Sequence, residues 1–272
     1  MLKKIMLLLG FSLILLASSY ADKNQQKEAK EIKECSNEEI INSKYYAAML
    51  WYRNSAEMKA LYRQIFSNAE DTISNTIMHE NLKPKTWGVA LALDATLLDD
   101  SGYALQKLNT CNPESIETRY TYETKNTLPA TPGAAELSCG IQELGGKVFI
   151  VTNRNGGGES GINTMAATIQ NLNHNEICYD SVIFANDSTD SNKNPRFNAI
   201  TSGDYENVIS TKQQRATPLI AYFGSNIQDF PNLKQNILHN VNGNNEEFDS
   251  FGAEYFMLPN PISGNWQENQ LQ

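Results

Sequence analysis

Residues 88–103, GVALALDATLLDDSGY, decide the fold class of this chain. An apolar, β-prone run begins at Gly88 and ends in one acid, Asp94, before a turn-like Asp-Asp-Ser-Gly. Ligands of parallel sheets bind beyond the carboxyl ends of the strands, so a strand that ends in an acid predicts an active site there. Phosphate-handling sites of this kind usually carry two aspartates separated by one residue, and here Ala92 occupies the first position.

Further apolar runs extend this unit along the chain. They cover residues 147–152, 181–185, 218–224 and 254–258, with helical patterns at 133–144, 160–173, 229–239 and, more loosely, 195–212. Strands that alternate with helices predict an α/β fold with a parallel sheet, built as a three-layer sandwich. The residues just after each strand are therefore expected at one edge of the sheet. Polar loops at 109–132 and 186–198 are predicted to frame the mouth.

The first 35 residues have the pattern of an export signal and a linker. Two lysines, an apolar run over 5–17 and a small-residue Ser-Tyr-Ala predict a signal peptide over 1–21, cleaved after Ala21. The run is short for a membrane span of about 20 residues. Ser18 and Ser19 stand where a lipoprotein would need a cysteine. The chain is therefore expected to be periplasmic or secreted, without a membrane span or lipid anchor, and 22–35 to be a flexible lead-in.

Two helices are predicted next, over 38–78, and they define an N-terminal helical lobe over 36–80. Ser36 and Glu39 form a capping-box pattern, and a second helix start follows at residues 54–57. The remainder, 81–272, is expected to be the α/β domain.

Charge and cysteine content limit the possible partners. The formal net charge is −9, and removal of Lys3 and Lys4 with the signal peptide makes it about −11. An acidic surface argues against nucleic acid as a partner, because phosphate backbones need clustered lysine and arginine. A small phosphomonoester or phosphate held in one local pocket remains the expected ligand. Four cysteines remain, none in a CxxC or metal-ligand spacing, and in an exported chain they allow up to two disulfides in three pairings: Cys35, Cys111, Cys139 and Cys178.

Several long stretches, in order, resemble one family. They are MLWYRNSAEMKALYRQIF (49–66), LDATLLDDSGY (93–103), TPGAAELSCGIQELGGKVFIVTNRN (131–155), SNKNPRF (191–197), YFGSNIQDF (222–230) and FGAEYFMLPNPISGNW (251–266). Together they resemble the haloacid-dehalogenase superfamily, and within it the exported class C acid phosphatases and lipoprotein 5′-nucleotidases. The resemblance covers most of the chain, from about Tyr45 to Trp266.

The resemblance implies a phosphate-monoester hydrolase that forms an aspartyl-phosphate and requires Mg²⁺. In the first family motif a nucleophilic Asp precedes, by two positions, an Asp that acts as general acid and base. These positions are Ala92 and Asp94 here. In the fourth motif, Gly-Asp-Asn-x-x-Asp, the Mg²⁺ ligand position is Ser225 and the last acid is Asp229.

The phosphate-binding motifs are matched more closely. A hydroxyl after the second strand corresponds to Thr152, and the lysine that neutralises phosphate corresponds to Lys193. Asn153 and Arg154 follow Thr152 and are predicted to contribute to the same site. Asp229 is expected to pair with Lys193 or to cap the following helix, with at most an indirect role toward a metal.

The substitutions predict a degenerate phosphatase. Mg²⁺ is usually held by one or two carboxylates in octahedral oxygen coordination, so the chain is expected to bind it weakly or not at all. Loss of a covalent nucleophile costs on the order of 10⁶ in turnover in a serine hydrolase. We therefore expect retained binding of phosphate or a small phosphomonoester, with slow hydrolysis or none.

Two alternatives remain open on sequence grounds. In the first, Asp94 is itself a nucleophile shifted by two residues, and the chain is an active acid phosphatase. In the second, the scaffold serves as a non-enzymatic interaction protein. Asp99 and Asp100 are expected to be solvated turn acids. Substrate identity and oligomeric state have no signature in the sequence.

Overall fold

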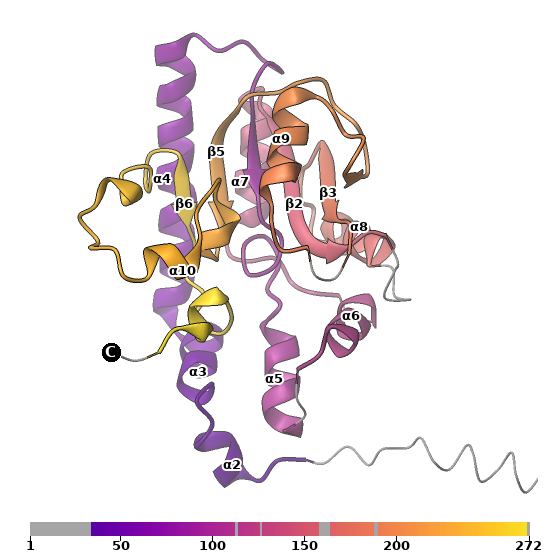
Figure 1. Ribbon diagram of the computed structural model, residues 1–272, viewed down its shortest axis with the longest axis vertical. Coiled ribbons are helices and arrows are strands. Elements are labelled where there is room, and N and C mark those ends of the chain that lie inside the picture. The colour runs from indigo at the N-terminus through magenta and orange to yellow at the C-terminus, as the bar shows by residue number, and fades with distance from the viewer. Residues whose placement is uncertain (1–33, 112–113, 126, 158–163, 188–189, 271–272) are drawn as a thin grey trace, which may run out of the picture.

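One six-stranded sheet forms the centre of the fold in this computed structural model, which describes residues 34–111, 114–125, 127–157, 164–187 and 190–270 (Figure 1). The strand order is β4-β3-β2-β1-β5-β6, and every neighbouring pair is parallel except β3 and β4. The strands are β1 (Gly88–Leu91), β2 (Lys147–Asn155), β3 (Ser181–Ala185), β4 (Ile209–Ser210), β5 (Leu219–Gly224) and β6 (Tyr255–Met257). The predicted α/β class with a mostly parallel sheet is confirmed.

Alternate side chains of the central strands enter two separate cores. Val89, Leu91, Val148 and Ile150 belong to the larger core, which includes residues of α4, α7 and α8. Ala90 and its neighbours on the opposite face form a smaller core with α9. The layers are α4 (Ala56–Glu80), α7 (Ala134–Glu143) and α8 (Met165–His174) on one face and α9 (Asn194–Ser202) on the other.

The N-terminal part forms three helices where two were expected: α2 (Asn37–Ile41), α3 (Tyr46–Asn54) and α4. The predicted capping box of Ser36 and Glu39 is present at the start of α2. The long helix α4 runs along the sheet (Figure 1), and its residues Phe66 and Ile73 share one core with the central strands. The domain boundary expected at residue 80 stays a prediction. In the structure, α4 forms part of one layer of the sandwich.

Two helices lie where the sequence predicted a turn and a polar loop. Helix α5 (Ser101–Thr110) follows the turn after β1, and α6 (Ile116–Lys125) lies within the segment expected to be a loop. Helix α6 is polar and buries few side chains, among them Tyr120 and Glu123. A hydrophobic pattern therefore could not reveal it.

The end of the chain is less helical than its pattern predicted. Residues 229–239 contain only the four-residue helix α10 (Gln235–Leu238), preceded by the 3-10 turn η1 (Ile227–Asp229). The remaining short turns are η2 (Glu246–Phe248) and η3 (Asn265–Glu268). The loosely helical segment 195–212 contains α9 and then the edge strand β4.

Two disulfides settle the cysteine pairing. Cys35 is bonded to Cys111, and Cys139 to Cys178. The predicted signal peptide and nearly all of the lead-in lie outside the described residues. Within the part of the chain that the structure describes, no helix has the length and apolar character needed to cross a membrane.

Candidate functional site

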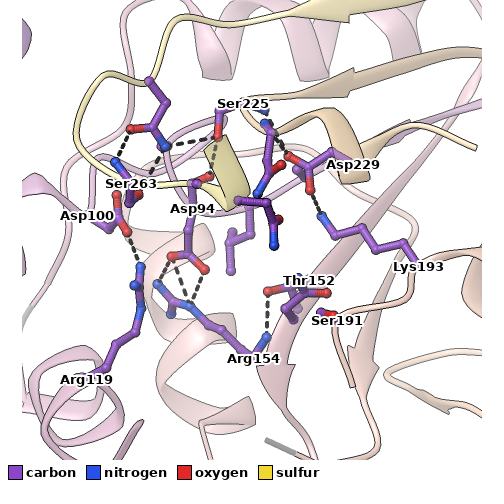
Figure 2. A pocket seen from close by; sticks show the side chains of 18 of the residues that line it. Asp94, Asp100, Arg119, Thr152, Arg154, Ser191, Lys193, Ser225, Asp229 and Ser263 are labelled. Atoms are coloured by element: carbon purple, nitrogen blue, oxygen red, sulfur yellow. Dashed lines mark hydrogen bonds and ion pairs between the residues drawn. The ribbon is translucent and has the colours of Figure 1, made fainter. Parts of the chain in front are cut away.

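A pocket of about 570 Å³ opens at the C-terminal ends of β1, β2 and β5, and we call it the strand-end pocket (Figure 2). All eight residues singled out in the sequence line it. They are Ala92, Asp94, Thr152, Asn153, Arg154, Lys193, Ser225 and Asp229. The expectation that the strand ends converge on one site therefore agrees with the geometry.

The turn after β1 has an unusual backbone that α4 supports. Ala95 has φ of 51°, in the left-handed region that residues with a Cβ rarely adopt. The hydroxyl of Tyr62, buried in α4, donates a hydrogen bond of 2.7 Å to the carbonyl of Ala95. The N-terminal helices thus hold the turn that places Ala92 and Asp94 in the pocket.

Asp94 is held in an ion pair with Arg154. The Arg154 Nη2 atom lies 2.6 Å from Asp94 Oδ1, and Nε lies 3.1 Å from Oδ2. Burial acts to raise the pKa of Asp94, but the charge and hydrogen bonds of Arg154 outweigh it and hold that pKa below its ordinary value. A carboxylate held ionised in this way is poorly suited to donate a proton.

Arg154 also faces a second buried acid, Glu123, on α6. Its Nε lies 3.5 Å from Glu123 Oε2, and both side chains are only 2% exposed. Burial raises the pKa of Glu123. The Nη1 atom of the guanidinium donates to the Thr168 hydroxyl at 3.1 Å. Arg154 is thus directed at protein acids, whereas the sequence had suggested that it would face a bound phosphate.

Arg119 links α6 to the start of α5. Its Nη2 forms a very short contact with Asp100 (Figure 2). Its Nε lies 3.1 Å from Glu123 Oε1. Burial raises the pKa of Asp100 to about 7, with Arg119 opposing and Asp94 adding to the shift. The expectation of a solvated turn acid is wrong for Asp100, because α6 folds over it and supplies the arginine.

Lys193 and Asp229 form the second ion pair of the pocket. Lys193 Nζ lies 2.6 Å from Asp229 Oδ1, and the two side chains are 5% and 10% exposed. Burial lowers the pKa of Lys193. Oδ2 of Asp229 accepts from the N–H groups of Ser225 and Asn226 at 2.9 and 3.0 Å, so Asp229 both pairs with Lys193 and caps the turn η1.

Asp229 approaches β5 closely because Gly224 has no side chain. A Cβ at Gly224 would lie 2.3 Å from the Cβ of Asp229. The Gly224 position therefore allows η1 to fold back against the strand end. This return places the Lys193–Asp229 pair beside Ser225 and the end of β1 (Figure 2).

Several hydrogen-bond donors face the same space. Among the residues that the structure describes, the N–H groups of Leu93 and Asp94 donate to no protein acceptor. Both residues line the pocket, as does Thr152. Arg196 donates to the carbonyl oxygen of Thr152 and so fixes the end of β2. Unpaired N–H groups beside a buried lysine are the usual components of an anion site.

The oxygen donors do not suit Mg²⁺. Near Ala92, Ser225 Oγ donates to the Asp94 carbonyl at 3.4 Å and is approached by Asn260 Nδ2 at 3.5 Å. The carboxylates of Asp94 and Asp229 are already paired with Arg154 and Lys193. No group of three or more histidine, cysteine or acidic side chains that could hold a metal occurs within the described ranges. Since Mg²⁺ needs carboxylate ligands with free oxygens, the residues present do not fit this ion.

Sequence reasoning missed Asp100, Arg119 and Glu123 as members of the site. The spacing of Arg119 and Glu123 is that of a helical i,i+4 pair, which was a possible signal. The segment around them carries no apolar stripe, so it was predicted to be a loop.

Comparison with known proteins agrees with this geometry. Two structures from Bacillus anthracis are similar in fold: a class C acid phosphatase (TM-score 0.66, 20% identity) and a class C acid phosphatase with tungstate bound (TM-score 0.66, 22% identity). In both cases 81% of this chain and 85% of the other chain are covered. Residues 12–266 match the family described as HAD superfamily, subfamily IIIB (Acid phosphatase). The chain therefore belongs to the subfamily IIIB acid phosphatases of the HAD superfamily.

Proposed function

We propose that this chain is an exported, catalytically degenerate phosphatase that binds phosphate monoesters in the strand-end pocket and hydrolyses them slowly or not at all. One observation carries the proposal. Ala92, at the end of the central strand β1, places a methyl group in the pocket where the family mechanism needs an attacking carboxylate.

The binding half of the proposal rests on donors that remain. Lys193 supplies a buried positive charge, and Leu93, Asp94 and Thr152 supply N–H and hydroxyl groups around the same space. Charge-assisted hydrogen bonds of this kind bind phosphate oxygens well. Ala92 lacks the negative charge that would repel the phosphate.

The loss of turnover is supported by three features together. Ala92 has no oxygen that can attack phosphorus, Asp94 is held ionised by Arg154, and the donor set does not suit Mg²⁺. The Arg154 pair also weakens the alternative in which Asp94 is a shifted nucleophile, because both carboxylate oxygens accept hydrogen bonds from the guanidinium. Positioning and electrostatics alone leave roughly 10³–10⁴ over water in a serine protease that lacks its triad.

Export is supported by the cysteines. Both cysteine pairs of the described residues are bonded, and no free cysteine remains. Disulfides persist in the oxidising compartments that exported proteins reach. The N-terminal pattern of lysines, apolar run and small residues points to the same destination.

The first test is hydrolysis of a chromogenic phosphomonoester at acid pH with Mg²⁺. The native chain is compared with an Ala92→Asp/Ser225→Asp double variant, which restores the carboxylates at both positions. The double variant is expected to be faster on the order of 10³-fold or more, in line with the weight of a lost nucleophile. A native rate that is metal-dependent and is abolished by Asp94→Asn would instead identify Asp94 as the nucleophile.

The second test is calorimetric titration of the native chain with inorganic phosphate and nucleoside monophosphates. Heat of binding at millimolar ligand, lost in a Lys193→Met variant, is expected. Absence of heat with every phosphate compound would favour the interaction-protein alternative and would reject the proposed pocket function.

A further inference from the structure

A shallow groove of about 850 Å³ opens beside the strand-end pocket, and we call it the amide groove. Its lining comes from the start of α9, η1, α10 and the C-terminal turn η3. The residues are Ser191, Asn192, Asn194, Gln228, Leu233, Lys234, Gln235, Asn236, His239, Asn240, Asn265, Glu268, Asn269 and Gln270. Three of them, Ser191, Asn265 and Glu268, also line the strand-end pocket, so the two hollows are continuous.

The amide groove differs from the pocket in its chemistry. Nine of its fourteen residues carry side-chain amides, whereas about one residue in six of the whole chain does. Its only titratable side chains are Lys234, His239 and Glu268. The strand-end pocket, in contrast, is lined by ten charged residues. The groove therefore suits a neutral ligand that both donates and accepts hydrogen bonds.

Part of the amide set is fixed by the fold. Asn194 Nδ2 donates to Asn192 Oδ1 at 2.9 Å, and the N–H of Asn232 donates to Asn194 Oδ1 at 2.9 Å. Asn265 Oδ1 accepts from Asn226 Nδ2 at 2.7 Å. These bonds hold the amides of Asn194 and Asn265 in one orientation, which lowers the entropy lost when they bind a ligand.

Other amides keep their full hydrogen-bonding capacity. The side chains of Gln228, Gln235 and Asn236 form no hydrogen bond with any residue that the structure describes. Each amide offers two N–H donors and a carbonyl acceptor. Adjacent hydroxyls, each able to donate and accept, match this set.

We propose that the amide groove binds the polyhydroxylated part of a sugar phosphate whose phosphoryl group lies in the strand-end pocket. The proposal deepens the function proposed above and rests on it, because the phosphoryl group anchors the ligand. Ser191, Asn265 and Glu268 lie at the junction, where the ester oxygen passes from one hollow to the other.

A rival position for the organic group exists beside α5. That pocket, of about 440 Å³, has apolar walls formed by Tyr45, Tyr103, Leu108 and Ile262. It would favour an aromatic ester over a sugar ester. The two sites therefore predict opposite ligand preferences, and a matched pair of ligands separates them.

The test is calorimetry of the mature chain with inorganic phosphate, glucose 6-phosphate and phenyl phosphate. We expect glucose 6-phosphate to bind at least ten-fold more tightly than phenyl phosphate. A Gln235→Ala/Asn236→Ala variant should lose most of that advantage and should keep the Kd for inorganic phosphate within two-fold. Both residues lie on α10, where alanine preserves the helix.

A Gln64→Ala/Asn68→Ala variant is the matched control, since these exposed amides on α4 line neither the groove nor the pocket. It should leave all three affinities unchanged. The inference would be overturned by equal affinities for the two esters, by tighter binding of phenyl phosphate, or by equal losses for all ligands in the α10 variant. These outcomes apply when inorganic phosphate binds to the native chain. Failure of inorganic phosphate to bind would reject the proposed function as well.

Discussion

Arg154 is the residue on which the buried charges of the site depend. It lies between Asp94 and Glu123 and is itself only 2% exposed. Removing one partner from a buried ionic group leaves uncompensated charge, which costs far more than the pair contributes over an apolar substitute. The stability of the site therefore depends on the presence of the arginine.

An Arg154→Met variant is expected to lose about 3–5 kcal/mol of unfolding free energy. The loss should be larger at pH 8 than at pH 5. Without the arginine, burial raises the pKa of Asp94 and Glu123 above their unfolded values, so their ionised forms destabilise the fold as pH rises. Urea unfolding of the variant and of the native chain at both pH values measures this loss of unfolding free energy.

Arg215→Met is the control, because Arg215 is exposed and should change stability by less than about 0.5 kcal/mol. A loss in Arg154→Met that does not depend on pH would contradict the role assigned to the two carboxylates.

Asp100 gives a second pH dependence, of opposite sign to that of the paired Asp94. Its folded pKa is raised to about 7, above the unfolded value of about 3.9. Between these values the folded state retains the proton, so stability falls as pH rises from 4 to 7 and then levels off. The difference in unfolding free energy between Asp100→Asn and the native chain should therefore shift in favour of the variant as the pH rises from 5 to 8.

Thermal or urea unfolding of Asp100→Asn, followed across this range, measures the gain. Asp71→Asn, at an exposed position on α4, should show no such trend. A flat difference for Asp100→Asn would show that Arg119 keeps Asp100 ionised throughout.

At the residue scale, the sequence indicated which side chains line the strand-end pocket, while their chemical roles stay predictions. Ala92 and Asp94 follow β1, Ser225 and Asp229 follow β5, Thr152 lies near the end of β2, and Lys193 directly precedes α9. They come together because the ends of parallel strands meet at one edge. The ion-pair partners of these residues are harder to predict from the sequence. The sequence predicts Arg154 to face phosphate, because nothing in the sequence indicates that Glu123, from α6, reaches the same guanidinium.

Helix α6 forms one wall of the strand-end pocket, and tertiary contacts hold it in place. Arg119 and Glu123 tie it to α5 and β2, and Tyr120 is its main buried apolar side chain. A helix with so little apolar surface is stabilised by its partners more than by its own propensity. This dependence is also why no periodicity in residues 109–132 predicted it.

An Arg119→Gln variant should therefore loosen α6 selectively. We expect amide hydrogen exchange in residues 116–125 to quicken at least ten-fold, while β1 and β5 keep their protection. Mass spectrometry of peptic fragments measures both regions in one experiment.

Arg63→Gln is the matched control, because its ion pair with Glu136 is exposed on both sides and contributes little. Uniform protection in Arg119→Gln would mean that α6 is held by packing alone.

For the whole molecule, the two hydrophobic cores and two disulfides set the stability. Cys35–Cys111 spans 76 residues and Cys139–Cys178 spans 39. In the chain-entropy account, each bridge contributes about 4 kcal/mol. Replacing either pair by serines should lower the unfolding free energy by about that amount, as measured by urea unfolding of the oxidised proteins.

Non-reducing peptide mapping of the native chain checks the pairing itself. A fragment that joins Cys35 to Cys139 or Cys178 would contradict it. The sequence allowed three pairings, and only the fold, which brings the end of α5 beside the start of α2, chooses among them.

The pairing follows the order of the cysteines along the chain, first with second and third with fourth. For a polypeptide that crosses a membrane N-terminus first, each thiol meets its native partner as the next one to emerge. For a chain exported as proposed, an oxidant on the far side can close both bridges in this order, and we expect the native pairing to form without a disulfide isomerase.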